Sequence, residues 1–225
     1  ESSQVASIFV LHFIAISETS WCTQDVTALI NKLFSLATQN SSIAADLAVF
    51  GVDPVDKIKL PLIFRGLQDL FGTASNEYQA NFIHTLYRET IVNQLSTTEK
   101  REALHRLLGM LCEACWIKPE QSFAELIVNY ALREGVIHLA KGQQVLIAAK
   151  RLLDFNANET GYLDKLYQIL PKDALSIVMR GIQQTQRSLT NRDKEWVTAL
   201  DSLRFVLSEH DPYLQSKEVD LLPTL

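Results

Sequence analysis

Apolar residues recur three and four positions apart along almost the whole chain, and this spacing constrains the fold more than any other feature. Such a period places apolar side chains on one face of an α-helix, whereas a half-buried strand needs alternation with a period of two. No stretch shows sustained alternation, and 8 Gly and 6 Pro in 225 residues are too few for a protein of many tight hairpins. We therefore predict an all-α protein of about ten helices.

Helix ends are predicted from residues that break or cap helices. Gly72 is expected to end one helix, and Ser75 to cap the next, which carries apolar residues over 78–91. Ser96 is expected to cap a further helix as a capping box with the glutamate three residues later. Gly135 is expected to stop the helix after that one.

Short links between the predicted helices favour an architecture of stacked bundles or an irregular α-solenoid. Loose boundaries near residues 73 and 150 divide the chain into bundle one (residues 1–72), bundle two (73–150) and bundle three (151–225). Modules of this size bury little surface when alone. We therefore expect them to pack end to end as one elongated rod.

Composition excludes several classes of protein. The net charge of −5 argues against a surface that neutralises many nucleic-acid phosphates. Three Cys cannot all pair within one chain, which favours a reducing compartment, and we expect a cytoplasmic protein. The apolar stretch over residues 5–16 is too short to span a bilayer, so we expect a buried helix of a soluble protein. The sequence begins at Glu1 without Met, and we expect further residues to precede it in the natural chain.

Cys112 and Cys115 form a C-x-x-C motif, with His105 seven residues earlier on roughly the same helical face. A reactive thiolate needs a helix N-terminus or a nearby cation, but this motif lies at the C-terminal end of a predicted helix. A structural zinc site needs four ligands, and only three converge here unless the distant Cys22 joins them. We interpret both cysteines as core residues and expect no metal site.

Other catalytic patterns do not occur in the sequence. The five His are scattered, there is no H-E-x-x-H pair, and no Gly-rich loop could cradle a phosphate. The densest basic cluster is Lys100, Arg101 and Arg106, which we interpret as a helix start of mixed charge, with a phosphate site as the minor alternative. We therefore expect neither enzymatic activity nor a cofactor.

Protein–protein interaction is the favoured class of function, because stacked helices form grooves that accept partner helices or extended peptides. Trp116 is the strongest candidate anchor among the three Trp if partly exposed, since it lies at a predicted helix end beside a loop. Burial in the core is the competing interpretation, because Trp is highly buried on average. The second candidate surface is the face of the penultimate helix that carries Arg180 and Arg187.

Part of the chain resembles the C-terminal module of the type III secretion gatekeepers. The resemblance is strongest over residues 145–189: the apolar helix 145–155, the segment 163–171 that ends in Leu-Pro, and a helix with an Arg and a Gln-rich apolar face. Residues 82–89 are similar to the aromatic-Arg helix of that family's middle module. Residues 191–195 depart from the family, because they are mixed in charge where it carries an acidic run.

This resemblance implies three consecutive helical bundles and a bacterial cytoplasmic regulator, peripheral to the secretion apparatus or itself secreted. Such a regulator docks on export-gate components and on chaperone–substrate complexes, and so delays effector release without a covalent step. The alternative is a helical-repeat scaffold or adaptor subunit of a larger eukaryotic assembly. A helical enzyme is a third class, which a deep polar pocket with shifted titratable groups would favour.

Overall fold

The computed structural model describes residues 2–17, 19, 21–54, 59–74, 77–82, 85–95, 97–117, 123–154, 161–190 and 193–214. Eleven α-helices, one 3₁₀ turn (Gln68–Leu70) and one two-stranded hairpin make up this part of the chain, which confirms the all-α prediction. The helices are α1 (Ser2–Ser17), α2 (Thr23–Ala37), α3 (Ser41–Ala48), α4 (Leu60–Leu67), α5 (Thr85–Gln94), α6 (Thr98–Ile117), α7 (Glu125–Lys141), α8 (Val145–Leu152), α9 (Tyr162–Ile169), α10 (Ala174–Ser188) and α11 (Lys194–Leu214).

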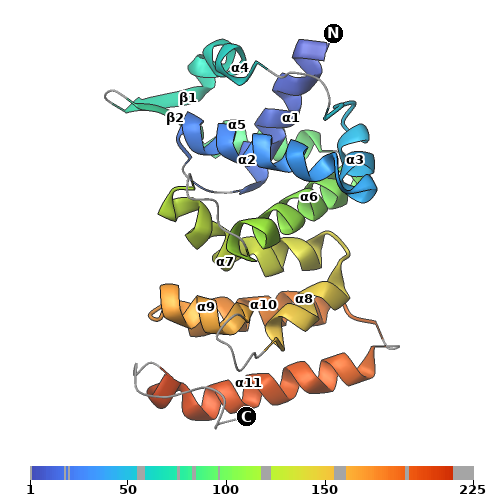
Figure 1. Cartoon of the computed structure of the whole chain (residues 1–225), viewed down its shortest axis with the longest axis vertical. Helices are drawn as coiled ribbons and strands as arrows, with labels where there is room; N and C mark the ends of the chain where they lie inside the picture. The colour runs from blue at the N-terminus through green and yellow to red at the C-terminus, as the bar shows by residue number, and fades with distance from the viewer. Residues whose placement is uncertain are drawn as a thin grey trace.

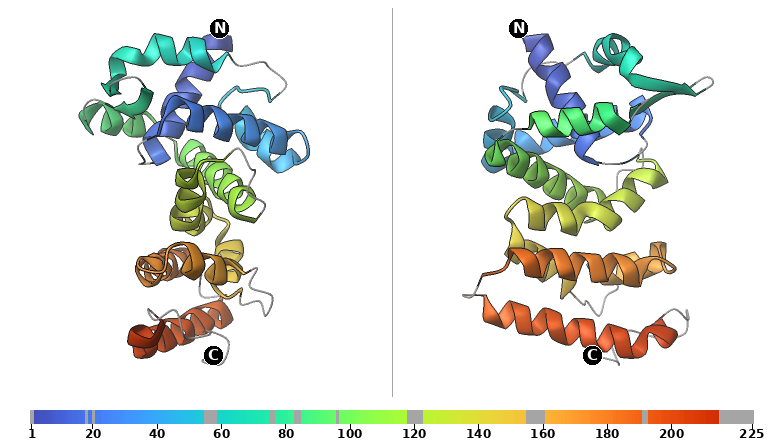
Figure 2. Two further views of the ribbon diagram at one scale, coloured as in Figure 1. Left: turned by 60° about the vertical axis from the view of Figure 1, so that its left-hand side comes forward. Right: turned by 180° about the vertical axis from the view of Figure 1, so that it is seen from behind.

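The helices lie in layers along an elongated molecule, with α1 at one end and α11 at the other (Figures 1 and 2). Helix α6 packs against α7, α7 against α8 and α10, and α10 against α11. Buried apolar residues from Ala6 to Leu207 form one cluster through these layers. The division into three bundles stays a prediction, and its boundaries near residues 73 and 150 fall inside a strand and inside α8.

The apolar period places the helices in the core as expected. In α2, Val26, Leu29, Ile30 and Leu33 are all buried, and their spacing of three and four keeps them on one face. Helix α1 likewise buries apolar side chains of the stretch 5–16. No helix among the described residues is both long and apolar enough to cross a membrane.

A β-hairpin replaces the beginning of the helix predicted from Ser75, so that prediction is wrong for residues 77–82. Strands β1 (Phe71–Ala74) and β2 (Glu77–Phe82) pair antiparallel. Phe71 lies opposite Phe82, with 5.3 Å between the ring centroids. The backbone N–H of Ala80 donates to the carbonyl oxygen of Trp21 at 2.7 Å. The strand pairing and the contact with Trp21 both join residues that are apart in the sequence. Neither can be recognised from a short apolar run.

Gly135 does not stop a helix, because α7 continues through it to Lys141. A Cβ atom at Gly135 would lie 2.9 Å from the Cβ atom of Cys112, so the glycine permits close approach of α6 and α7. Gly109 of α6 has the same role, since its Cβ would lie 2.9 Å from the backbone nitrogen of Leu139. The two glycines therefore act through packing rather than through backbone freedom.

The structure describes the beginning of α6 from Thr97 onward. The backbone N–H of Lys100 donates to Thr97 Oγ1 at 3.3 Å, and the helix begins at Thr98. Ser96, which was predicted to cap this helix, lies outside the described residues.

Candidate functional site: a polar groove beside α10

Three helices, α6, α7 and α10, each carry a stripe of polar side chains, and the stripes line two adjoining cavities. Residues three, four and seven positions apart share one face of a helix. The stripes follow this spacing and consist of Thr98, Arg101, Glu102 and His105 on α6, Glu134, His138 and Lys141 on α7, and Arg180, Gln184 and Ser188 on α10.

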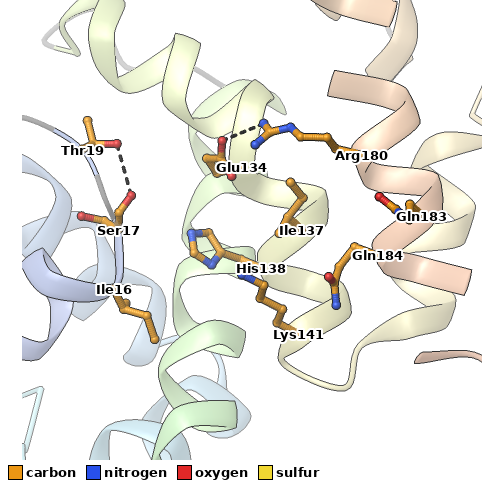
Figure 3. A pocket seen from close by; sticks show the side chains of 10 residues that line it. All are labelled: Ile16, Ser17, Thr19, Glu134, Ile137, His138, Lys141, Arg180, Gln183 and Gln184. Carbon is orange, nitrogen blue, oxygen red and sulfur yellow. Dashed lines mark hydrogen bonds and ion pairs between the residues drawn. The ribbon is translucent and has the colours of Figure 1, made fainter. Parts of the chain in front are cut away.

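The α10 groove, as we name it, consists of two adjoining cavities that share Lys141 and Gln184 in their lining. The first cavity has a volume of about 330 Å³ and is drawn in Figure 3. The second cavity has a volume of about 470 Å³ and is lined by polar residues of all three helices. Volumes of several hundred Å³ are typical of sites for small ligands.

A buried chain of hydrogen bonds links α6 to α7 beside the groove. His105 Nδ1 lies 2.8 Å from His138 Nδ1, and the hydroxyl of Tyr130 lies 2.7 Å from His138 Nε2. His105 is 7% exposed and His138 4% exposed. His105 lines the second cavity and His138 the first, so the histidine pair connects the two.

Burial keeps both imidazoles neutral at pH 7. It lowers the pKa of His105 to about 3, and the charges of Lys141 and Arg101 act in the same direction. It also lowers the pKa of His138 well below its usual range, with further contributions from His105 and Lys141. The contact between the two Nδ1 atoms holds a single proton, so one of these nitrogens donates and the other accepts.

Arg180 crosses from α10 to α7 at the edge of the first cavity (Figure 3). Its Nη2 atom donates to Glu134 Oε1 at 2.8 Å. The Arg180 side chain is 51% exposed, which makes the pair a surface ion pair of modest strength. Arg187 is exposed on the same helix but is not among the residues that line either cavity.

Trp116 is buried, although it lies at a helix end. It was a candidate anchor for a partner only if partly exposed, so the structure does not support that role. Its side chain is 4% exposed, and the ring of Tyr162 packs edge-on against it with centroids 5.6 Å apart. The guanidinium of Arg151 and the ammonium of Lys165 lie over the indole at 5.8 and 5.6 Å from its centroid. The neighbouring helices α8 and α9 therefore cover the residue, and sequence spacing alone did not reveal this.

Cys112 and Cys115 are buried thiols of the core, as predicted. Burial raises the pKa of the Cys112 thiol well above its ordinary value. His105, which shares the α6 face with Cys112, hydrogen-bonds to His138 of α7 instead of joining a set of ligands. Within the described ranges, no group of three or more His, Cys, Asp and Glu is placed to hold a metal ion.

The sequence did not predict the groove: Arg101 was interpreted as part of a helix start of mixed charge, and Arg180 as part of a separate candidate surface. The spacing within each helix was visible in the sequence, but the choice of neighbouring helix was not. A polar cavity with shifted histidines is also the feature expected of a helical enzyme, and burial accounts for the direction of both shifts. The chain matches no protein-family model, no curated protein and no solved structure.

Proposed function

We propose that this chain is a non-enzymatic protein–protein interaction module that works by occupying the surface of a partner. The observation that carries the proposal is the exposed side chain of Phe205 on α11, the last helix of the described part of the chain. Phe205 of α11 is 67% exposed among polar side chains such as Arg204 and Ser208, while Leu203 and Leu207 of the same helix are buried. An exposed aromatic side chain on this helix suits the anchor of a contact with another protein.

The opposite end of the stack supports the same proposal. Leu62 of α4 and Leu86 of α5 are each more than half exposed. Single exposed apolar residues are common on proteins, so each alone carries little weight. Their presence at both ends of an elongated stack is what a module that bridges two partners would need.

The finer proposal is that the module regulates the order or timing of type III secretion, as a gatekeeper does. It rests on the sequence resemblance over residues 145–189, which span α8, α9 and α10. The proposed partners are export-gate components and chaperone–substrate complexes, at a cytoplasmic or apparatus-bound location. Secretion-apparatus genes beside this gene would support the proposal.

The alternative is a helical-repeat scaffold or adaptor subunit of a larger eukaryotic assembly. The layered order of α6, α7, α10 and α11 favours it, because each helix packs mainly on its neighbours in the stack. Introns in the gene would favour this alternative over the secretion regulator.

Site-specific photo-crosslinking in the native host tests the interaction proposal. A photo-reactive residue at Phe205 is expected to capture a second protein, because this side chain lies on the proposed contact face. The matched control places the same residue at Lys172, an exposed position in the turn before α10. Equal capture at both positions, or capture at neither, would contradict the assignment of this face.

A further inference from the structure

The second cavity of the α10 groove contains charges that the proposed interaction role does not use. Arg101 and Lys141 line it, and within the described residues neither side chain forms an ion pair or hydrogen bond. Glu102 also lines this cavity, where it accepts from Gln143 Nε2 at 3.2 Å, and Glu134 of the first cavity accepts from Arg180. The lining therefore carries two cations and one carboxylate, which leaves it with a net positive charge.

His105 adds a directional donor to the same cavity. Its ring is more than nine-tenths buried and lines the cavity, and Nδ1 is occupied by His138. When the Tyr130 hydroxyl donates to His138 Nε2, the proton of His138 is on Nδ1 and points to His105 Nδ1. The proton of neutral His105 then lies on Nε2, which has no protein partner among the described residues.

The beginning of α6 completes the cavity wall. Thr98, the first residue of this 20-residue helix, lines the cavity. Backbone N–H groups and the positive end of the helix dipole favour negative charge at such a position. The hydroxyl of Ser188 and the amide of Gln184 line the cavity from α10.

We propose that the second cavity binds a small phosphate-bearing molecule, whose phosphate contacts Arg101, Lys141 and the Nε2–H of His105. A guanidinium offers paired donors that match phosphate oxygens, and an ammonium adds a point charge. The volume of about 470 Å³ exceeds the size of a phosphate ion, so a phosphorylated small molecule fits the space better than the ion alone. Glu102 and Gln184 are placed to accept hydrogen bonds from the rest of such a ligand.

Titration with inorganic phosphate and with phenyl phosphate tests this site, at constant ionic strength and pH 7. NMR of the histidine side chains is expected to show saturable shifts of the His105 ring nitrogens with both ligands. Acetate tests whether the site binds carboxylates equally well. It is expected to bind at least about tenfold more weakly than phenyl phosphate, because it is a monoanion with one fewer acceptor oxygen.

Arg101→Gln and Lys141→Gln test the assignment without a change in the core, because both side chains are exposed at the rim. Each is expected to weaken phosphate binding about tenfold, a loss typical of a charge-assisted hydrogen bond. The matched control is Arg204→Gln on α11, an exposed arginine outside the cavity lining, which is expected to leave binding unchanged.

Three results would overturn the proposal. The first is the absence of saturable shifts at His105. The second is acetate binding as tight as that of phosphate, which would make the site a general anion site. The third is an equal loss of binding in Arg204→Gln and Arg101→Gln, which would indicate non-specific attraction. None of these results bears on the Phe205 surface, so the two proposals fail or stand separately.

Discussion

His105 and His138 face each other across the α6–α7 interface with their Nδ1 atoms 2.8 Å apart. One proton occupies this contact, so the two nitrogens cannot both be protonated. The pair is 33 residues apart in sequence and is continued by the hydroxyl of Tyr130. The interface between two central helices of the stack thus depends on histidines that stay neutral.

Acidification below pH 6.5 is expected to destabilise the fold. The folded-state pKa of His105 is about 3 and that of His138 is also lowered, so the unfolded chain binds more protons than the folded one below pH 6.5. The contribution of the neutral histidines to the free energy of unfolding is fully present above pH 6.5. It is lost as the pH falls toward the folded-state pKa. The loss is on the order of 1 kcal/mol per pH unit for each histidine. Urea unfolding at pH 7.5, 6 and 5 measures it.

His105→Gln separates the histidine effect from the titration of carboxylates. This variant is expected to lower stability at pH 7.5 but to show a shallower fall between pH 6.5 and pH 5, since one titrating group is gone. Equal slopes for the variant and the parent protein would show that His105 does not drive the pH dependence.

Gly135→Ala is expected to destabilise the protein, because the new Cβ would lie 2.9 Å from the Cβ atom of Cys112. Neither atom lies at the end of a flexible side chain, so α6 and α7 must separate, at a cost of about 1–3 kcal/mol. Gly66→Ala in α4 is the matched control, since nothing lies within 4 Å of its Cβ position. That change is expected to stabilise the protein by about 0.4–1 kcal/mol. Thermal unfolding of both variants gives the comparison, and a neutral Gly135→Ala would contradict the packing account.

Asp46→Ala is expected to cost about 3 kcal/mol in the free energy of unfolding, because it leaves the guanidinium of Arg106 without its partner. Arg106 Nη2 donates to Asp46 Oδ1 at 2.7 Å, and Nε donates at 3.1 Å. The Asp46 side chain is 8% exposed, and the pair joins α3 to α6.

The exposed pair of Arg180 and Glu134 supplies the control for the Asp46 variant. Glu134→Ala is expected to change stability by less than about 1 kcal/mol, because the partner arginine remains in water. Chemical denaturation of the two variants measures the difference. Similar losses in both would mean that burial does not set the strength of these pairs.

Removal of metal ions is expected to leave the melting temperature unchanged, because Cys112 and Cys115 are interpreted as packing residues. In the native protein a thiol reagent should modify Cys22, which is partly exposed, before the two buried thiols. Cys22→Ser isolates the buried pair and retains a good N-cap for α2. A large drop in melting temperature with chelator, together with exposure of the buried thiols, would contradict this interpretation.

Local signals in the sequence were sufficient for most helices, but not for the ends expected at Gly72 and Gly135, which lie in β1 and inside α7. The apolar face of α10 follows from the spacing of Ile177, Val178 and Ile182, all of which are buried. Gly51 has a φ of +71°, consistent with the left-handed stop that follows α3. These features were predictable because helix formation depends on residues within one or two turns of each other.

The sequence by itself determined that the chain forms helices and which side of most of them is apolar, because that pattern is local. Only the tertiary structure decided that residues 71–74 and 77–82 pair as strands, that Trp116 is covered by α8 and α9, and that three polar stripes meet beside α10. Each of these outcomes depends on which distant segment packs against a given face. That choice is made by shape and by the total area buried across the stack, and no short window of residues encodes it.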